Sequence, residues 1–400
     1  MTRKKQTNSI YRNIRLFKVD AFLSGLWPLN ALAIIYFEQI THSYALAMLV
    51  WSITRLSQTL TEVPTGIFSD KIGRRKTLML AALSIITCFF LWALAGQLSH
   101  SWLLFVGAFF WGLSDSFLSG TQEALMYETI EELNQKENFS TLYAKTNFWM
   151  QCGLGSSALL AAGITYFFSL QTLAWVSIFP ISGQLITAYL FTEPKRTASQ
   201  KQLPSLAHFI LAFRRLWRNK RLRFYAFFTI FDEAVGHTYR YLESAYFKSL
   251  IKDWLINLLR FINQTSGMIG FALVPHLKRF GSVKLFFTSV TINEVIKTVG
   301  ILINSIFSPF IMSCVNLFWG IAMTSKTDIL QHEFSANQRA TIQSIIEVFK
   351  SILGAIILYL FGILADMFTP RIAIAAGIST KFCLLLGAFL ILRRKKIESN

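Results

Sequence analysis

The sequence predicts an all-α integral membrane protein in which twelve transmembrane helices form two pseudo-symmetric six-helix bundles. Three observations lead to this fold class. Of the 400 residues, 53% are hydrophobic and 15% are charged, whereas roughly a quarter are charged in a soluble domain. Apolar runs of about twenty residues, the length that crosses the hydrocarbon of a bilayer, recur along the whole chain. A long basic segment divides these runs six and six.

The predicted spans are separated by short polar turns, and one span is unusually polar. The seventh carries Asp232, Glu233 and Arg240, so it fits inside a bundle or along a wet cavity and not against lipid. We keep it because an even number of spans agrees with the distribution of Lys and Arg. The spans lie near residues 17–39, 45–68, 77–97, 102–127, 146–168, 172–191, 224–247, 254–276, 285–304, 309–330, 341–363 and 371–391.

Lys and Arg are concentrated on one predicted side of the membrane. With both chain ends in the cytoplasm, 28 of the 39 Lys and Arg fall in inside segments. This asymmetry is typical of a multi-pass plasma-membrane protein in contact with lipid. The net charge of +18 is scattered over separate loops and does not line one soluble face, so we expect no nucleic acid partner.

The longest polar segment, residues 192–222, separates an N-terminal bundle of residues 1–191 from a C-terminal bundle of residues 223–400. Apolar residues recur in this linker at helical spacing with cations between them, which predicts a basic amphipathic helix on the inner leaflet. A solvated basic linker is the alternative. The tripeptide Phe-Trp-Gly at 110–112 recurs at 318–320, the equivalent place six spans later, and this echo favours two related halves.

The hairpin between the second and third spans holds the most specific motif. From Gly66 to Lys76 the sequence reads Gly-Ile-Phe-Ser-Asp-Lys-Ile-Gly-Arg-Arg-Lys. It closely resembles the signature loop of the major facilitator superfamily, which implies the fold and the transport function of that superfamily. We expect Gly66 to let helices approach closely and Gly73 to permit a tight turn. The cations Arg74 and Arg75 lie where an anionic leaflet would hold them.

Asp70 is an anion among these cations. In the superfamily the matching Asp is a gate latch between the two halves, near a helix N-terminus where the dipole favours a carboxylate. The resemblance implies that role for Asp70; a loop that only turns the chain is the alternative. The second half has an equivalent hairpin at residues 274–281, with Lys278 in place of the Asp. We therefore expect the turn there to be kept without a second latch.

Acids inside the fourth span are the best candidates for chemistry, because a charge in the bilayer needs a partner, a wet cavity or a function. We predict that Glu123, with Asp115 or Glu62, takes and releases a proton as access alternates. Tyr127, four residues from Glu123 and on the same helix face, can hydrogen-bond that carboxylate or the substrate. For Asp115 the alternative is a structural ion pair with Arg55, which lies at a similar depth in the second span.

The second half carries further charges within its spans. Asp232 and Glu233 are adjacent, so they point about 100° apart on a helix, and we expect one of them to line a cavity. Lys381 lies too deep in the twelfth span to reach the surface and has no partner that the sequence names. Spacing of three residues predicts structural ion pairs between Arg240 and Glu243, Glu294 and Lys297, and Glu347 and Lys350.

These features predict a secondary active transporter that moves a small organic solute by alternating access, coupled to protons. Proton antiporters of the superfamily often carry a Gly-Pro-Gly-rich run in the fifth span. Residues 153–157 match that run without its Pro, so the export signature is incomplete and close helix packing is the favoured interpretation of this run. The prediction still leans toward export. An uptake symporter, or a non-transporting receptor on the same fold, is the alternative function.

Other classes of function find no support in the sequence. No Ser-His-Asp set, His-rich metal spacing or Gly-rich phosphate loop is present, so we expect neither an enzyme nor a cofactor. The four cysteines fall in spans far apart and predict neither a disulfide framework nor a metal site.

The run at 119–127 looks like one in a branch of bacterial facilitators, which implies a bacterial inner membrane. Nothing in the spans favours association, so we expect a monomer.

Overall fold

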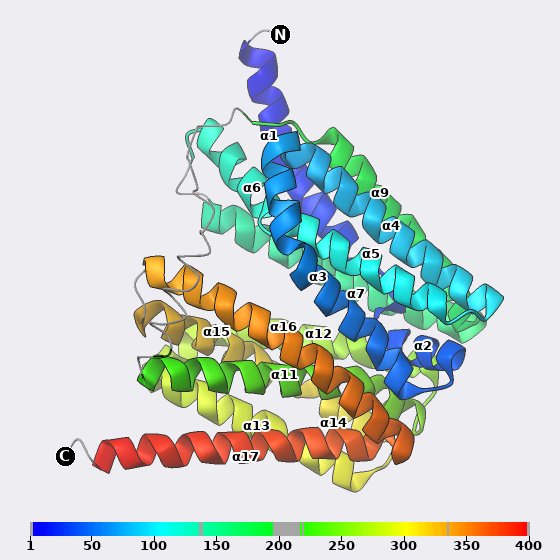
Figure 1. Ribbon diagram of the computed structural model, residues 1–400, viewed down its shortest axis with the longest axis vertical. Helices are drawn as coiled ribbons and strands as arrows, with labels where there is room; N and C mark the ends of the chain where they lie inside the picture. The colour runs from blue at the N-terminus through cyan, green and yellow to red at the C-terminus, as the bar shows by residue number, and fades with distance from the viewer. Residues whose placement is uncertain (1–2, 136–138, 195–216, 218–219, 334–335, 398–400) are drawn as a thin grey trace. The chain divides into compact units, whose positions relative to one another are not determined.

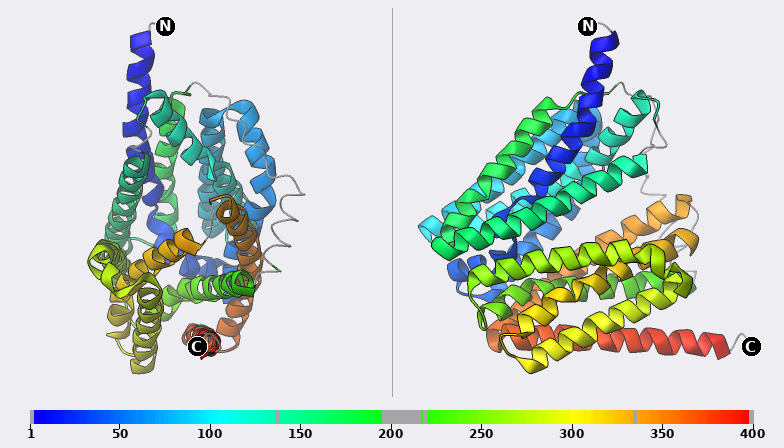
Figure 2. Two further views of the ribbon diagram at one scale, coloured as in Figure 1. Left: turned by 90° about the vertical axis from the view of Figure 1, so that its left-hand side faces the viewer. Right: turned by 180° about the vertical axis from the view of Figure 1, so that it is seen from behind.

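The computed structural model describes residues 3–397 apart from 136–138, 195–216, 218–219 and 334–335, and these residues form helices joined by turns (Figures 1 and 2). Most of the predicted amphipathic helix therefore lies outside the described residues. The helices are α1 (Arg3–Gly25), η1 (Pro28–Leu32), α2 (Ala33–Thr41), α3 (Tyr44–Ile72), α4 (Arg74–Leu98), α5 (Trp102–Leu118), α6 (Thr121–Glu132), α7 (Phe139–Phe167), α8 (Leu170–Val176), α9 (Ile178–Leu190), α11 (Lys220–Lys248), α12 (Asp253–Leu277), η3 (Lys278–Phe280), α13 (Ser282–Ile303), α14 (Ser308–Cys314), α15 (Asn316–Glu333), α16 (Ala336–Met367) and α17 (Pro370–Ile397).

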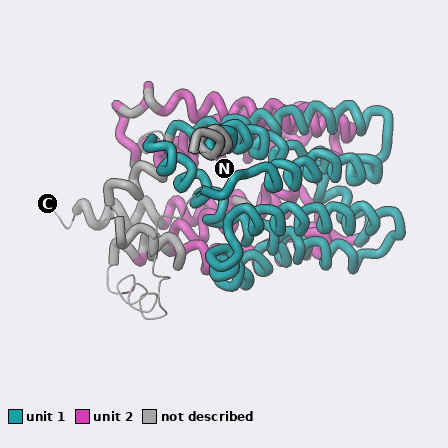
Figure 3. Tube along the Cα trace, turned by 90° about the horizontal axis from the view of Figure 1, so that it is seen from above, with its two compact units in different colours: residues 1–42, 49–201 teal, residues 43–48, 202–400 magenta. Residues whose placement is uncertain are grey.

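The helices gather into two compact units (Figure 3). Residues 1–42 and 49–201 form the first, called here the N-unit, and residues 43–48 and 202–400 form the second, the C-unit. In the N-unit, α1 packs against α7 and α9, and α4 packs against α5 and α9. In the C-unit, α11 packs against α16 and α17, and α13 packs against α15 and α17. The same pairs of spans thus recur six spans later, as pseudo-symmetric bundles require.

Within the described residues, seven helical segments are long and apolar enough to cross a membrane. They are Ile10–Thr41, Arg74–Leu98, Trp102–Glu132, Leu170–Leu190, Lys284–Ile303, Ile346–Met367 and Pro370–Gly387. The helices α3, α7, α11, α12 and α15 are not among these seven segments. The count of twelve spans therefore stays a prediction, and each predicted span overlaps one to three of the described helices.

The exterior of the helices is apolar and parts of the interior are polar. Phe179 on α9 and Leu302 on α13 expose 77% and 71% of their surface, whereas Asn13 and Thr238 are fully buried. An aqueous solvent would drive the large apolar side chains inward, but lipid has no such preference. The distribution is the one expected of helices that satisfy their own backbone hydrogen bonds in a bilayer.

Glycines set the closest helix approach in the N-unit. A Cβ atom at Gly153 on α7 would lie 2.1 Å from the carbonyl oxygen of Phe22, and one at Gly25 on α1 would lie 2.3 Å from that of Met150. Side chains at these positions would push α1 and α7 apart. The close-packing interpretation of residues 153–157 is confirmed at Gly153.

Candidate functional site

A polar cavity of about 220 Å³ lies within the C-unit. Its walls come from α11, α12, α13, α14, α15, α16 and α17, so every long helix of the unit contributes. The cavity explains why the seventh predicted span is so polar, because the acids of α11 line it. The charged residues of the lining are Asp232, Glu233, Arg240, Glu243, Glu294, Lys297, Lys350 and Lys381.

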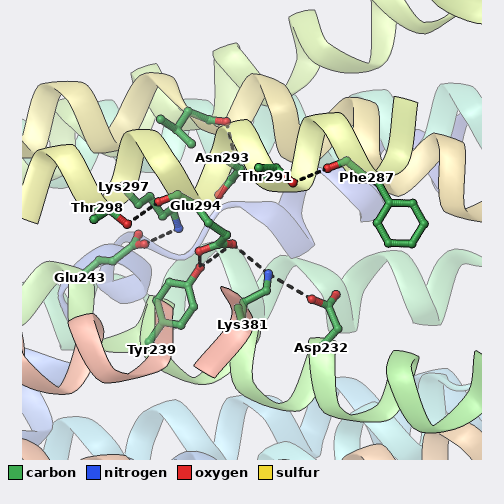
Figure 4. Close-up of polar contacts among 11 residues, drawn as sticks. Asp232, Tyr239, Glu243, Phe287, Thr291, Asn293, Glu294, Lys297, Thr298 and Lys381 are labelled. Atoms are coloured by element: carbon green, nitrogen blue, oxygen red, sulfur yellow. Dashed lines mark hydrogen bonds and ion pairs between the residues drawn. The ribbon is translucent and has the colours of Figure 1, made fainter. Parts of the chain in front are cut away.

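Lys381 of α17 is at the centre of the charged network (Figure 4). Its Nζ atom lies 2.9 Å from Oε1 of Glu294 on α13 and 3.3 Å from Oδ1 of Asp232 on α11. The Tyr239 hydroxyl donates to the same Glu294 carboxylate, at 2.8 Å from Oε2. Gly236 leaves room for the lysine, since a Cβ there would lie 3.0 Å from Lys381 Nζ. One ammonium thus serves the buried carboxylate of Glu294 and the half-buried carboxylate of Asp232, which come from different helices.

A second ion pair continues the network. Lys297 on α13 donates to Glu243 Oε1 on α11 at 2.6 Å, and its Nζ lies 4.9 Å from the centre of the Tyr239 ring (Figure 4). The predicted pairs of Arg240 with Glu243 and of Glu294 with Lys297 are wrong, because both acids take cations from another helix. Spacing along one helix identifies neighbours on that helix only, and packed helices bring closer partners.

Arg240 differs from the other cations of the lining. It donates to Oδ1 of Asn316 on α15 at 3.3 Å, and its guanidinium carbon lies 5.3 Å from the centre of the Trp319 ring. Among the described residues, no carboxylate lies within 4.0 Å of it. The guanidinium is therefore held by an amide and an aromatic face, without a counter-ion.

Asp232 and Glu233 both line the cavity, so the prediction that one of them does is wrong. Glu233 pairs with Lys350 of α16 at 2.9 Å, while Asp232 faces Lys381 of α17. Both acids are accommodated because α11 packs against α16 and against α17. The predicted pair of Glu347 with Lys350 is confirmed at 2.5 Å.

The N-unit holds its interior acids differently. Asp115 on α5 accepts from the indole N–H of Trp111, one turn earlier, at 3.0 Å. The described residues contain no ion pair between Asp115 and Arg55, so that alternative does not hold in this structure. Asp20 on α1, which the sequence analysis missed, is buried and accepts from Thr187 at 2.5 Å and from Gln122 at 3.2 Å. An acid within the first predicted span was the available signal.

The other predicted proton-pathway residues of the N-unit lie apart from Asp115. The fourth span breaks at Gly120, which has a φ of +69°, so Asp115 belongs to α5 and Glu123 to α6. Glu123 and Tyr127 are both exposed on α6, as the shared face predicts, but no hydrogen bond between them is formed. Glu62 accepts from Ser119 at 3.3 Å. Glu62, Glu123 and Tyr127 are all exposed, and none of them lines a described cavity with Asp115.

The motif hairpin builds a charged corner around Arg74. Gly73 has a φ of +100°, which confirms the tight turn, and α4 starts directly after it. The Arg74 side chain lies 2.9 Å from Asp70 and 3.4 Å from Glu128 of α6. The carboxylate of Glu193, also missed in the sequence, accepts from the backbone N–H groups of Arg74 and Arg75 at 2.7 Å and 3.1 Å. It thereby satisfies two free donors at the N-terminus of α4.

Two further expectations for the hairpins can be compared with the structure. A Cβ at Gly66 would meet no described atom within 4 Å, so the predicted close helix approach there is wrong. The guanidinium of Arg75 lies 4.8 Å from the centre of the Tyr189 ring, within the protein and not only at a leaflet. The second hairpin keeps its turn, since Gly281 has a φ of +78° directly before α13. Nothing is described of the Lys278 side chain.

Comparison with known proteins agrees with this geometry. Residues 21–358 match the family described as the Major Facilitator Superfamily. The chain belongs to this superfamily. No curated protein matches the sequence.

Solved structures of superfamily transporters share the fold. The nucleoside transporter NupG has a TM-score of 0.76 at 15% identity, covering 96% of this chain and 99% of NupG. A bacterial homolog of the human lysosomal transporter Spinster has a TM-score of 0.71 at 11% identity, with 98% of each chain covered. The D-xylose-proton symporter has a TM-score of 0.70 at 13% identity, covering 94% of this chain and 97% of the symporter. At these identities the likeness shows the fold of a multi-pass membrane transporter.

Proposed function

We propose that this superfamily member moves a small polar organic solute across the membrane by alternating access and binds that solute in the C-unit cavity. The observation that carries the proposal is the charged network inside the C-unit, where four carboxylates and four cations line one cavity. Charges inside a bilayer cost several kcal/mol each, so they are retained for a function more often than for packing. Transporters of similar fold include one for nucleosides and one for D-xylose.

Proton coupling is assigned to the N-unit. Among the described residues, Asp20 and Asp115 have neutral hydrogen-bond partners and no ion pair. A proton can neutralise such a carboxylate where no cation does. Glu123 on the exposed face of α6, with Glu62 and Tyr127, keeps its predicted part in exchanging protons with water. The similarity to a proton symporter supports the coupling.

The direction that we propose is export by proton antiport. The Gly-rich run at 153–157 supports it only in part, because Gly153 already has a packing function against Phe22. Uptake with a proton is the second candidate, and the fold likeness to the D-xylose-proton symporter favours it. Both directions use the same cavity and the same acids.

We further propose a monomer in the bacterial inner membrane with both termini cytoplasmic. The concentration of Lys and Arg in the predicted inside loops supports this orientation. In that orientation the Arg74 corner lies at the cytoplasmic surface, where Asp70 acts as the gate latch. The chain needs no enzyme chemistry for this function.

The test is transport by the purified protein in proteoliposomes with an imposed pH gradient. The solute is first identified by metabolite profiling of cells with and without the gene. We expect solute-dependent proton movement in the wild type, its loss in Glu123→Gln, and its retention in the control Glu38→Gln on α2. A Glu123→Gln protein that couples normally would exclude Glu123 from the proton pathway. A wild type that moves neither solute nor protons would contradict the proposed function.

A further inference from the structure

Within the described part of the chain, Arg240 has no carboxylate within ion-pair distance, whereas every other charge of the cavity lining has a partner of opposite sign. Each carboxylate of the lining lies within 3.3 Å of a lysine ammonium. Arg240 instead contacts the Asn316 amide and the Trp319 ring. A guanidinium that has lost part of its water and has no anion is costly, and a ligand carboxylate would remove that cost.

The surroundings hold Arg240 ready for an anion. The Asn316 amide is fixed because its Nδ2 donates to the backbone carbonyl of Asn263 at 3.0 Å. Of the five N–H donors of the guanidinium, one is used by Asn316. A second guanidinium, Arg260 on α12, has an Nε without a hydrogen-bond partner among the described residues, but it is not part of the cavity lining. The remaining N–H donors of Arg240 favour a carboxylate, which matches guanidinium geometry in two parallel bonds.

The size and the remaining lining define the rest of the ligand. A cavity of about 220 Å³ has room for a small organic molecule. The lining beyond the charged groups includes the apolar side chains of Phe286, Val290 and Met312. A small molecule with a short apolar body therefore fits beside the polar end.

Resting on the proposed function, we propose that the solute is a small organic carboxylate whose carboxylate binds Arg240. A neutral solute would leave the guanidinium without a counter-ion. An organic cation would have to compete with Lys297 or Lys381 for carboxylates that already hold an ammonium at 2.6 Å and 2.9 Å. The anion is the class of solute that completes the charges of the cavity.

The binding test uses the full chain in detergent and needs neither vesicles nor a gradient. Thermal unfolding is followed with a series of carboxylates from acetate to benzoate, each measured beside its own amide. We expect at least one carboxylate to raise the unfolding midpoint by about 2 °C or more, while its amide does not. Arg240→Gln should lose the shift, and Lys248→Gln, an exposed cation on the same helix, should keep it. The proposal is overturned if no carboxylate exceeds its amide, or if Arg240→Gln keeps the shift.

A second measurement covers the case in which Arg240→Gln does not fold. Tryptophan fluorescence of the wild type is titrated with the same carboxylates and amides, because the Trp319 ring touches the guanidinium. A saturable change with the carboxylate, absent with the amide and lost in Trp319→Phe, supports the proposal; equal changes with both ligands contradict it. Binding of a carboxylate without solute-linked proton movement in proteoliposomes would overturn the proposed coupling and leave the anion site standing. If only neutral solutes are transported together with protons, the anion site is overturned and the proposed coupling stands.

Discussion

The two units carry their buried acids in opposite ways. In the N-unit, Asp20 and Asp115 are held by a threonine, a glutamine and a tryptophan. In the C-unit, Asp232 and Glu294 share the ammonium of Lys381. A carboxyl group with neutral partners can gain or lose a proton without breaking an ion pair, whereas a paired one cannot. The difference suggests a division of work in which the N-unit carries protons and the C-unit binds the solute.

The repeated tripeptide shows the same contrast on one shared framework. A Cβ at Gly112 would lie 2.4 Å from the Thr54 carbonyl oxygen, and one at Gly320 would lie 2.6 Å from that of Gly267. The helix contact is thus alike in both units. The tryptophan before each glycine has different surroundings in the two units. Trp319 faces Arg240. Trp111 lies among four aromatic rings, those of Trp27, Trp51, Phe89 and Trp92. Common packing has been kept while the chemistry has diverged.

The largest effect on stability is expected at Lys381. Lys381→Met leaves the buried Glu294 and the half-buried Asp232 without their shared cation, and breaking a buried pair costs about 3–5 kcal/mol. Thermal unfolding in detergent and the yield of folded protein measure the loss. Lys248→Met, at the exposed end of α11, is the control and should change neither. Stability equal to the wild type in Lys381→Met would show that the C-unit does not depend on its ion pairs.

The two hairpin turns give the next effect. Gly73→Ala places a Cβ at a φ of +100° and 2.8 Å from the Glu193 carboxylate, for a cost of about 1–3 kcal/mol. Gly281→Ala, with a φ of +78° and open space around it, should lose less. Gly66→Ala is the helical control and should be neutral or slightly stabilising. Unfolding midpoints of the three variants give this order. Equal losses of stability in Gly73→Ala and Gly281→Ala would show that the contact with Glu193 adds nothing to the cost at Gly73.

Removing a charge from the N-unit interior should affect stability little. Asp115→Asn keeps an acceptor for the Trp111 indole, so we expect a change within about 1 kcal/mol. Asp20→Asn should behave alike, because an amide can still accept from Thr187. A loss as large as that of Lys381→Met, in the same unfolding assay, would mean that these acids are structural.

The smallest effect on stability is expected at Asp70. Its pair with Arg74 has 55% of the aspartate side chain exposed, and such pairs contribute about 0–1 kcal/mol. Asp70→Asn should therefore express and unfold like the wild type but transport at a different rate. A variant that is lost from the membrane instead would support a purely structural hairpin.

The fold could be predicted from the sequence because its main signals are local. Apolar runs, the motif beginning at Gly66 and the turn at Gly73 depend on a few neighbouring residues. Partners of buried charges depend on how distant helices pack, which is why Lys381 had no predicted partner and Glu243 was given the wrong one. The contacts of Glu193 with the start of α4, and of Gln122 on α6 with Asp20, likewise depend on how segments distant in sequence pack.

The division of work between the units is tested most directly by comparing solute exchange with accumulation driven by a pH gradient. In proteoliposomes, exchange of labelled for unlabelled solute needs the binding site but no net proton movement, whereas accumulation needs both. We predict that Asp115→Asn keeps exchange near the wild-type rate and loses accumulation, and that Arg240→Gln loses both. If Asp115→Asn loses both activities together, or keeps accumulation, the assignment of protons to the N-unit is contradicted.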